Sequence, residues 1–136
     1  MIGLVVADGA TKIMPQYLIG IMFHDPEPFA QWNHGLIEDY ESSTGLFVDA
    51  DSTAEAVVWG EHVGQALLRH VNQDDSLDWR TFGYFCWVEE SPMSSRWSHC
   101  LDFFLRVCVG EMPDLEQMGT AAYCRWQEKQ PDRTLR

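Results

Sequence analysis

Residues 81–88 (Thr-Phe-Gly-Tyr-Phe-Cys-Trp-Val) constrain the fold most, because nearly every position in this segment is apolar. Its aromatic and β-branched residues favour a β-strand, in which successive side chains alternate between two faces. One face of this strand would carry Phe82, Tyr84, Cys86 and Val88, and the other would carry Gly83, Phe85 and Trp87. Both faces of the sheet that contains it therefore need cover.

Three arrangements would provide that cover. Residues 29–43 or 91–102 could fold over the open face of the sheet, two copies of the chain could pack sheet to sheet as a homodimer, or the face could line a ligand cavity. A large uncovered apolar patch is unusual on a soluble monomer. The sequence leaves the three arrangements open.

The clearest local signal is a capped helix over about 53–71. Ser52 is followed three residues later by Glu55, which is the pattern of a capping box. The spacing predicts an inward stripe made of Ala56, Trp59, Gly60, Val63, Leu67 and Val71. Gly60 and Gly64 each cost about 1 kcal/mol relative to alanine in a helix, so we expect the backbone there to lie close against a sheet.

The remaining patterns complete one α+β domain over residues 1–126. Apolar runs at 17–23, 45–50 and 103–109 predict strands, and Asp114 is a candidate N-cap for a helix that ends near residue 126. The β-β-α-β-β-α order favours a two-layer sandwich, ferredoxin-like or a permuted relative of that fold. The polar residues 127–136 predict a disordered tail.

The charge balance disfavours two classes of partner. The chain has 9 Lys and Arg residues against 21 Asp and Glu residues, a net charge of −12. Affinity for nucleic acids and for anionic membranes depends on clustered basic residues, so we expect neither partner. No apolar stretch approaches the roughly 18 residues that span a bilayer, and the four cysteines form no C-x-x-C pair. We therefore expect reduced thiols and a cytoplasmic protein.

The acidic clusters indicate a surface that attracts a basic protein. Our first hypothesis is an inhibitor- or immunity-like interaction domain that is not an enzyme and has no cofactor. No EF-hand pattern and no metal-ligand histidine spacing is present, so we expect no metal site. The residues expected to form the protein-binding surface are Glu38, Asp39, Glu41, Asp74, Asp75, Asp78, Glu89 and Glu90.

The second hypothesis is a small-molecule binder or an enzyme with an aromatic pocket between the sheet and the helices. The segment Trp-Ser-His-Cys at 97–100 places a thiol beside an imidazole, a combination that can activate a nucleophile. No glycine-rich phosphate loop accompanies it. The residues expected to line this pocket are Trp59, Tyr84, Trp87, Trp97, His99 and Cys100.

Overall fold

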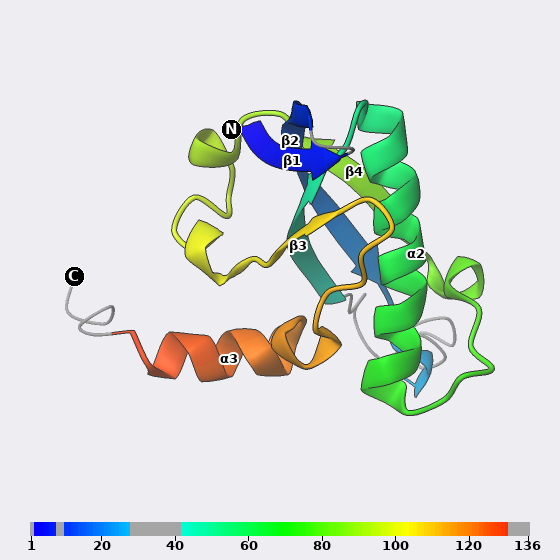
Figure 1. Cartoon of the computed structure of the whole chain (residues 1–136). Helices are drawn as coiled ribbons and strands as arrows, with labels where there is room; N and C mark the ends of the chain where they lie inside the picture. The colour runs from blue at the N-terminus through cyan, green and yellow to red at the C-terminus, as the bar shows by residue number, and fades with distance from the viewer. Residues whose placement is uncertain (1, 8–9, 28–41, 131–136) are drawn as a thin grey trace.

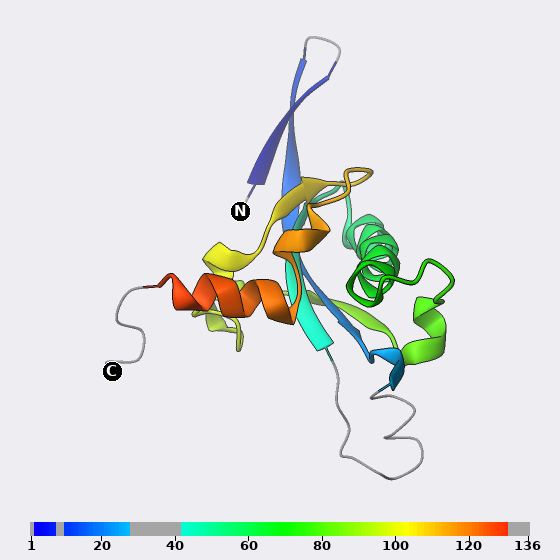
Figure 2. The same ribbon diagram turned by 90° about the horizontal axis from the view of Figure 1, so that it is seen from below.

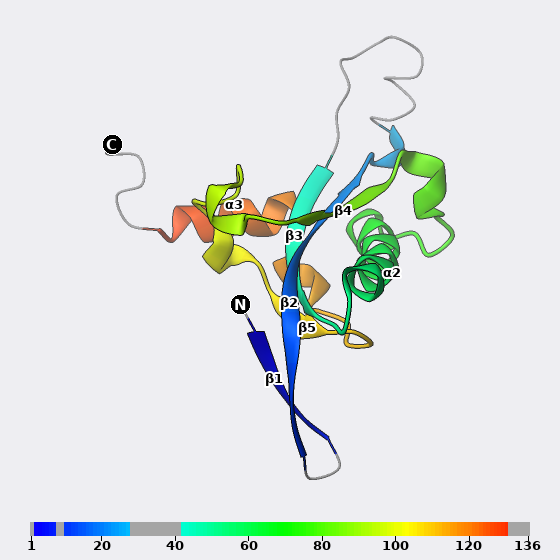
Figure 3. The same ribbon diagram turned by 90° about the horizontal axis from the view of Figure 1, so that it is seen from above.

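A computed structural model describes residues 2–7, 10–27 and 42–130 of the chain. Its centre is a mixed sheet in the order β4 (Phe85–Glu89), β2 (Ala10–Phe23), β3 (Ser42–Asp49) and β5 (Arg106–Cys108). Strand β2 is antiparallel to β3 and to β4, whereas β3 is parallel to β5. The first half of β2 also forms an antiparallel hairpin with β1 (Ile2–Ala7), and Figure 3 shows this hairpin projecting from the sheet. The α+β class is therefore confirmed.

The helix α2 (Thr53–Asn72) confirms the capping prediction in a slightly shifted form. The Ser52 hydroxyl accepts a hydrogen bond from the Glu55 N–H at 3.2 Å. The Glu55 carboxylate, however, accepts from the N–H of Asp51 at 3.3 Å, one residue before the cap. The first bond satisfies an N–H group that a helix start leaves without an intrahelical partner, and the second fixes the residue that precedes the cap.

The two glycines of α2 allow the helix to approach its neighbours closely (Figure 1). A Cβ atom at Gly60 would lie 2.6 Å from Ile19 of β2 and 2.8 Å from the Cys86 sulfur of β4. A Cβ atom at Gly64 would lie 2.6 Å from the Trp79 ring. The predicted stripe is wrong at Val71, which is 45% exposed because it borders an open cavity, while Leu68 is buried.

The predicted strand 81–88 is only half correct. Residues Trp79–Phe82 form the 3-10 helix η1, capped by the Asp78 side chain, which accepts from the Arg80 N–H at 3.0 Å. Gly83 follows at φ +64°, a left-handed conformation that ends the turn before β4 begins. Trp79, which the sequence left in a connecting turn, is 2% exposed and belongs to the core.

The predicted elements at 103–109 and 114–126 are shorter than expected. The strand β5 occupies only three residues and follows the 3-10 helix η3 (Leu101–Phe103). The expected second helix is divided into η4 (Leu115–Gln117) and α3 (Thr120–Glu128). Asp114 caps η4, and Gly119, at φ +89°, separates it from α3.

The two faces of the sheet are covered by different parts of the chain, as Figure 2 shows with α2 on one side and α3 on the other. The face that we call the α2 face carries buried aliphatic residues, among them Ile19, Leu46 and Val48. The opposite α3 face carries Leu18 and Phe47 beneath Cys100, Phe103, Phe104 and Ala122. Residues 97–104 cover part of this face together with α3, so cover by the 91–102 segment is present. Homodimerisation and a ligand cavity on this face stay predictions. Residues 29–41 lie outside the described residues.

Candidate functional site

A groove of about 370 Å³ lies on the α3 face, and we call it the α3 groove. It is bounded by the start of β3, by residues 96–104 and by the start of α3. Its polar lining consists of Ser43, Thr44, Arg96, His99, Thr120 and Tyr123. Its other lining residues are Trp97, Cys100, Phe103, Phe104 and Gly119. A groove of this size and mixed lining is within the range that holds small ligands.

A smaller cavity of about 130 Å³ adjoins the α3 groove, because Ser43, Thr44, Gly119 and Thr120 line both. It is mostly apolar and lies beside Leu67 of α2. Its one acidic lining residue, Asp25, already accepts hydrogen bonds from the Ser42 hydroxyl at 3.2 Å and from the Asn72 amide at 2.9 Å. The two hollows together surround the start of β3.

The start of β3 brings polar groups to this site because its outer edge has no neighbouring strand there. Among the described strands, β5 pairs with β3 only from Phe47 to Asp49. The Phe47 N–H points outward and donates to the Leu105 carbonyl at 2.9 Å. Since backbone groups alternate in direction along a strand, the N–H groups of Ser43 and Gly45 point to the same outer edge. No acceptor among the described residues pairs with either group.

Thr44 is the most deeply placed polar residue of the site. The residue is 5% exposed, and its hydroxyl makes no hydrogen bond to a described residue. The hydroxyl is not one of the fully buried unpartnered atoms of the described side chains, which are Asp49 Oδ1 and Trp79 Nε1, so it is accessible from the two hollows that Thr44 lines. A water molecule or a ligand in the hollows would satisfy it.

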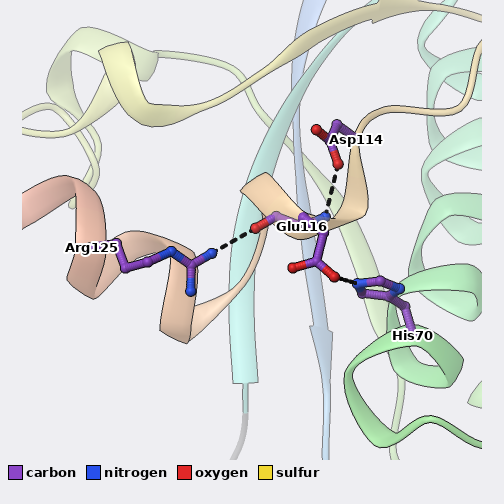
Figure 4. Close-up of polar contacts among 4 residues, drawn as sticks. All are labelled: His70, Asp114, Glu116 and Arg125. Carbon is purple, nitrogen blue, oxygen red and sulfur yellow. Dashed lines mark hydrogen bonds and ion pairs between the residues drawn. The ribbon is translucent and has the colours of Figure 1, made fainter.

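The start of α3 is fixed to α2 by contacts that centre on Glu116 (Figure 4). The Glu116 carboxylate lies 2.9 Å from Nε2 of His70 on α2, and its carbonyl accepts from the Arg125 guanidinium at 2.8 Å. The Glu116 N–H donates to the Asp114 carboxylate at 3.1 Å. These contacts hold Gly119 and Thr120 beside β3. The Gly119 cap provides no side-chain acceptor for the first N–H groups of α3.

Aromatic rings form the wall of the groove on the side of β4. Trp97 packs edge-on against Phe104 with ring centroids 5.1 Å apart, and the Arg96 guanidinium lies 5.3 Å from the centre of the Trp97 ring. Behind it, Trp87 stacks on Trp97 and fills the space that Gly20 of β2 leaves open. At the rim, the His99 Nε2 atom lies 3.3 Å from the Tyr123 hydroxyl.

The structure brings together three of the six residues predicted to form an aromatic pocket. Trp97, His99 and Cys100 line the α3 groove, with Trp87 behind Trp97. Trp59 lies elsewhere, on α2, where its indole N–H donates to the Glu111 carbonyl at 2.9 Å. Tyr84 packs on Trp79, with ring centroids 4.6 Å apart.

The cysteine thiols, of which only Cys100 lines the α3 groove, are poorly placed for nucleophilic chemistry. Cys100 is 3% exposed, and its neighbour His99 is directed to Tyr123. On the α2 face, burial and then the Glu61 charge raise the pKa of the Cys86 thiol to about 12. Burial, Asp49 and Glu111 also raise the pKa of Cys108. All four cysteines are thiols rather than disulfides, and Cys124 is the exposed one.

The predicted protein-binding acids fall into two described groups, one on the turn between α2 and η1 and the other at the end of β4. Asp74, Asp75 and Asp78 are exposed on the turn after α2, and Ser76 donates two hydrogen bonds to Asp74 that lower the pKa of this carboxyl. Glu90 is exposed after β4, whereas Glu89 is half-buried and accepts from the Trp87 indole at 2.9 Å. Glu38, Asp39 and Glu41 lie outside the described residues.

Sequence reasoning missed Ser43, Thr44, Arg96, Thr120 and Tyr123 of the α3 groove. Within the described ranges, no group of three or more His, Cys, Asp or Glu residues could hold a metal ion. In that same part of the chain, no helix has the length and apolarity needed to cross a bilayer. Neither a protein-family model, a curated protein nor a solved structure matches the chain.

Proposed function

We propose that this protein is an acidic interaction domain that binds a basic protein partner, as inhibitor- or immunity-type domains do. The supporting observation is that four of its few basic side chains interact with carbonyl groups or aromatic rings and, among the described residues, not with carboxylates. Arg69 and Arg125 donate to the carbonyls of Leu77 and Glu116, each at 2.8 Å. Arg80 and Arg96 lie over aromatic rings. Within the described residues, no carboxylate lies within ion-pair distance of these four guanidinium groups.

This arrangement leaves the excess negative charge of the chain uncompensated at its surface. The described ranges contain sixteen acidic residues and only seven basic residues. The exposed carboxylates at 74–78 lie on the turn before η1, and Glu90 follows β4, a strand that pairs only with β2 among the described strands. Such a surface accelerates association with a positively charged protein, and salt screens the attraction.

The proposal is tested with a small basic protein as the probe. We expect isothermal titration calorimetry at low salt to detect binding that weakens at least about tenfold when 0.3 M NaCl is added. The double variant Asp75→Asn with Glu90→Gln should weaken binding further at low salt. The matched control is Glu128→Gln with Asp102→Asn, which removes two exposed charges elsewhere. An equal loss in both double variants would show that net charge alone drives binding, and would contradict this surface.

The order and direction of the strands suggest a relation to a known fold, in addition to the α+β class. We propose a permuted relative of the ferredoxin-like arrangement. The β3-α2-β4 segment supports it, because β3 and β4 lie on either side of β2 and are both antiparallel to it. The parallel pairing of β3 with β5 is the departure from that arrangement. A cytoplasmic location is also proposed, on the basis of four reduced thiols.

A small-molecule binder is the second candidate function, and the α3 groove favours it. Three residues of the predicted pocket share a hollow of about 370 Å³ with Thr44, whose hydroxyl makes no hydrogen bond to a described residue. A ligand that binds the folded state raises thermal stability by mass action. We expect an upward shift in the melting temperature with a fragment bound there, and no shift with Trp97→Ala. An equal shift in both proteins would contradict binding at this groove.

A further inference from the structure

We propose that the α3 groove binds a small planar anion, an aromatic ring that carries a carboxylate or phosphate group. This inference rests on the second candidate function and specifies its ligand class. Three independent features of the groove support it: its local charge, its unsatisfied hydrogen-bond donors and its aromatic wall.

The local charge of the groove is opposite to that of the chain. Sixteen acidic and seven basic residues fall within the described ranges, yet no carboxylate is among the described residues that line the groove. Arg96 is the one permanently charged residue among these described lining residues. The nearest acid named at the site, Asp25, lines the adjoining cavity and is held by Ser42 and Asn72. An anionic group is therefore favoured in the groove and disfavoured in the cavity beside it.

Hydrogen-bond donors without acceptors converge at the same place. Thr44 is 5% exposed and lines the groove, and its hydroxyl makes no hydrogen bond to a described residue. The outward N–H group of Ser43, which also lines the groove, has no acceptor among the described residues. The nine-residue helix α3 starts at the groove wall without a side-chain cap. The start of a helix carries a partial positive charge, which favours a negatively charged group. The Thr44 hydroxyl can in addition donate a hydrogen bond to an oxygen atom of the ligand.

The aromatic wall of the groove favours a ligand whose uncharged part is a flat ring. The Trp97 and Phe104 rings meet edge to face at 5.1 Å, and Phe103 lies beside Phe104 with centroids 5.8 Å apart. A flat ring that enters the groove gains offset-stacked or edge-to-face contacts with these side chains. The volume of about 370 Å³ is near the lower limit for ligand pockets, so the ligand is about the size of one substituted ring.

The test uses phenyl phosphate, benzoate and the neutral analogue benzamide with the full chain in phosphate-free buffer. We expect calorimetry to show that one or both anions bind at least about tenfold more tightly than benzamide. The tighter of the two anions identifies the head group. Nuclear magnetic resonance should place the shifts at Thr44, Trp97 and Gly119.

Two variants locate the charge recognition. Arg96→Gln should weaken anion binding about tenfold or more and leave benzamide binding unchanged. The matched control is Arg80→Gln, because Arg80 also lies over an aromatic ring but does not line the groove. Thr44→Val, which keeps the side-chain shape, should weaken anion binding several-fold. The exposed Thr120→Ala provides a second hydroxyl test if the Thr44 variant does not fold.

The failures are distinguishable. Benzamide binding as tightly as the anions, at the same residues, would overturn the anionic ligand class but keep the small-molecule function. No binding of any probe at millimolar concentration would overturn both. An equal loss of affinity in the Arg80 and Arg96 variants would assign the effect to net charge and overturn recognition by the groove.

Discussion

The two faces of the sheet are built from different kinds of side chain, and the larger of the two hollows at the start of β3 lies on the α3 face. On the α2 face, Ile19, Leu46 and Val48 are completely buried beneath a helix brought close by two glycines. On the α3 face, Phe47, Phe103 and Phe104 meet as tilted rings, with a groove of about 370 Å³ beside them. Branched aliphatic residues pack densely, whereas planar rings in irregular turns leave room. The comparison indicates that the α2 face contributes more to stability, and the groove on the α3 face is the site of the proposed ligand.

The largest expected effect breaks the α2 face. Leu46→Ala removes a fully buried side chain beneath α2, so we expect the free energy of unfolding to fall by about 2–5 kcal/mol. Urea denaturation measures this change. Leu101→Ala, a partly buried position on the α3 face, serves as the comparison and should cost clearly less. Equal losses at both positions would contradict the division between the faces.

A smaller effect comes from filling space on the α3 face. Gly20→Ala would place a Cβ atom against the Trp87 ring at less than van der Waals distance, so the indole must shift relative to Trp97. We expect a loss of about 1–3 kcal/mol, together with a change in near-ultraviolet circular dichroism from the tryptophans. Ser94→Ala, at an exposed position of the same face, is the control. An unchanged tryptophan signal in the Gly20 variant would refute this packing.

Ionisation of the Cys86 thiol, which packs on the α2 face, makes the free energy of unfolding depend on pH. Its pKa is raised from 9.0 to about 12 in the folded protein, so the unfolded chain loses the thiol proton first as pH rises. The stability that this thiol contributes is complete below pH 9 and decreases between pH 9 and about 12. Urea midpoints measured over this range should fall more steeply in the wild type than in Cys86→Ala. Parallel curves would contradict the burial of the thiol.

The smallest effect concerns the link between the two helices. The His70–Glu116 pair is exposed, and exposed pairs contribute little because water and salt screen them. We expect His70→Gln to change the free energy of unfolding by less than about 1 kcal/mol. The same variant should still lower affinity for a ligand in the α3 groove, because the pair helps to hold Gly119. A loss of several kcal/mol would show that the link is structural rather than positioning.

Dimerisation through the sheet stays a prediction. The 91–102 segment covers much of the α3 face, yet Phe85 remains 53% exposed beside Trp87. Sedimentation equilibrium of the wild type and of Phe85→Ser measures it. A concentration-dependent mass in the wild type alone would support a sheet-to-sheet dimer, and a monomer in both would contradict it.

Local patterns predicted the elements whose signals lie within one short segment. The Ser52 cap, the spacing of α2 and the apolar parts of β2 and β3 required no knowledge of distant contacts. The errors at 79–83 and 114–119 occur where Gly83 and Gly119 adopt positive φ angles, so that a continuous pattern is divided into two elements. A glycine within a periodic run was the available signal in both places.

The candidate site was harder to predict because distant segments form it. The aromatic residues at 97–100 were identified from their composition, but Thr44 and Arg96 carry no local signal of ligand binding. Thr44 matters because β5 begins its pairing with β3 only at Phe47, and because η4 and α3 pass beside the remaining edge. Those facts belong to the tertiary structure rather than to any short stretch of sequence.

The length of β2 has a consequence for how the molecule opens. This single strand of 14 residues forms ladders with β1, β3 and β4, and α2 packs across it. If β1 separates from β2, the pairings of β2 with β3 and β4 remain intact. If residues 18–22 separate from their neighbours, the pairings with β3 and β4 are both lost and the apolar face of α2 is exposed to water. Amide protons in that stretch should therefore exchange with deuterium only when the whole domain unfolds, and those of the hairpin should exchange much sooner.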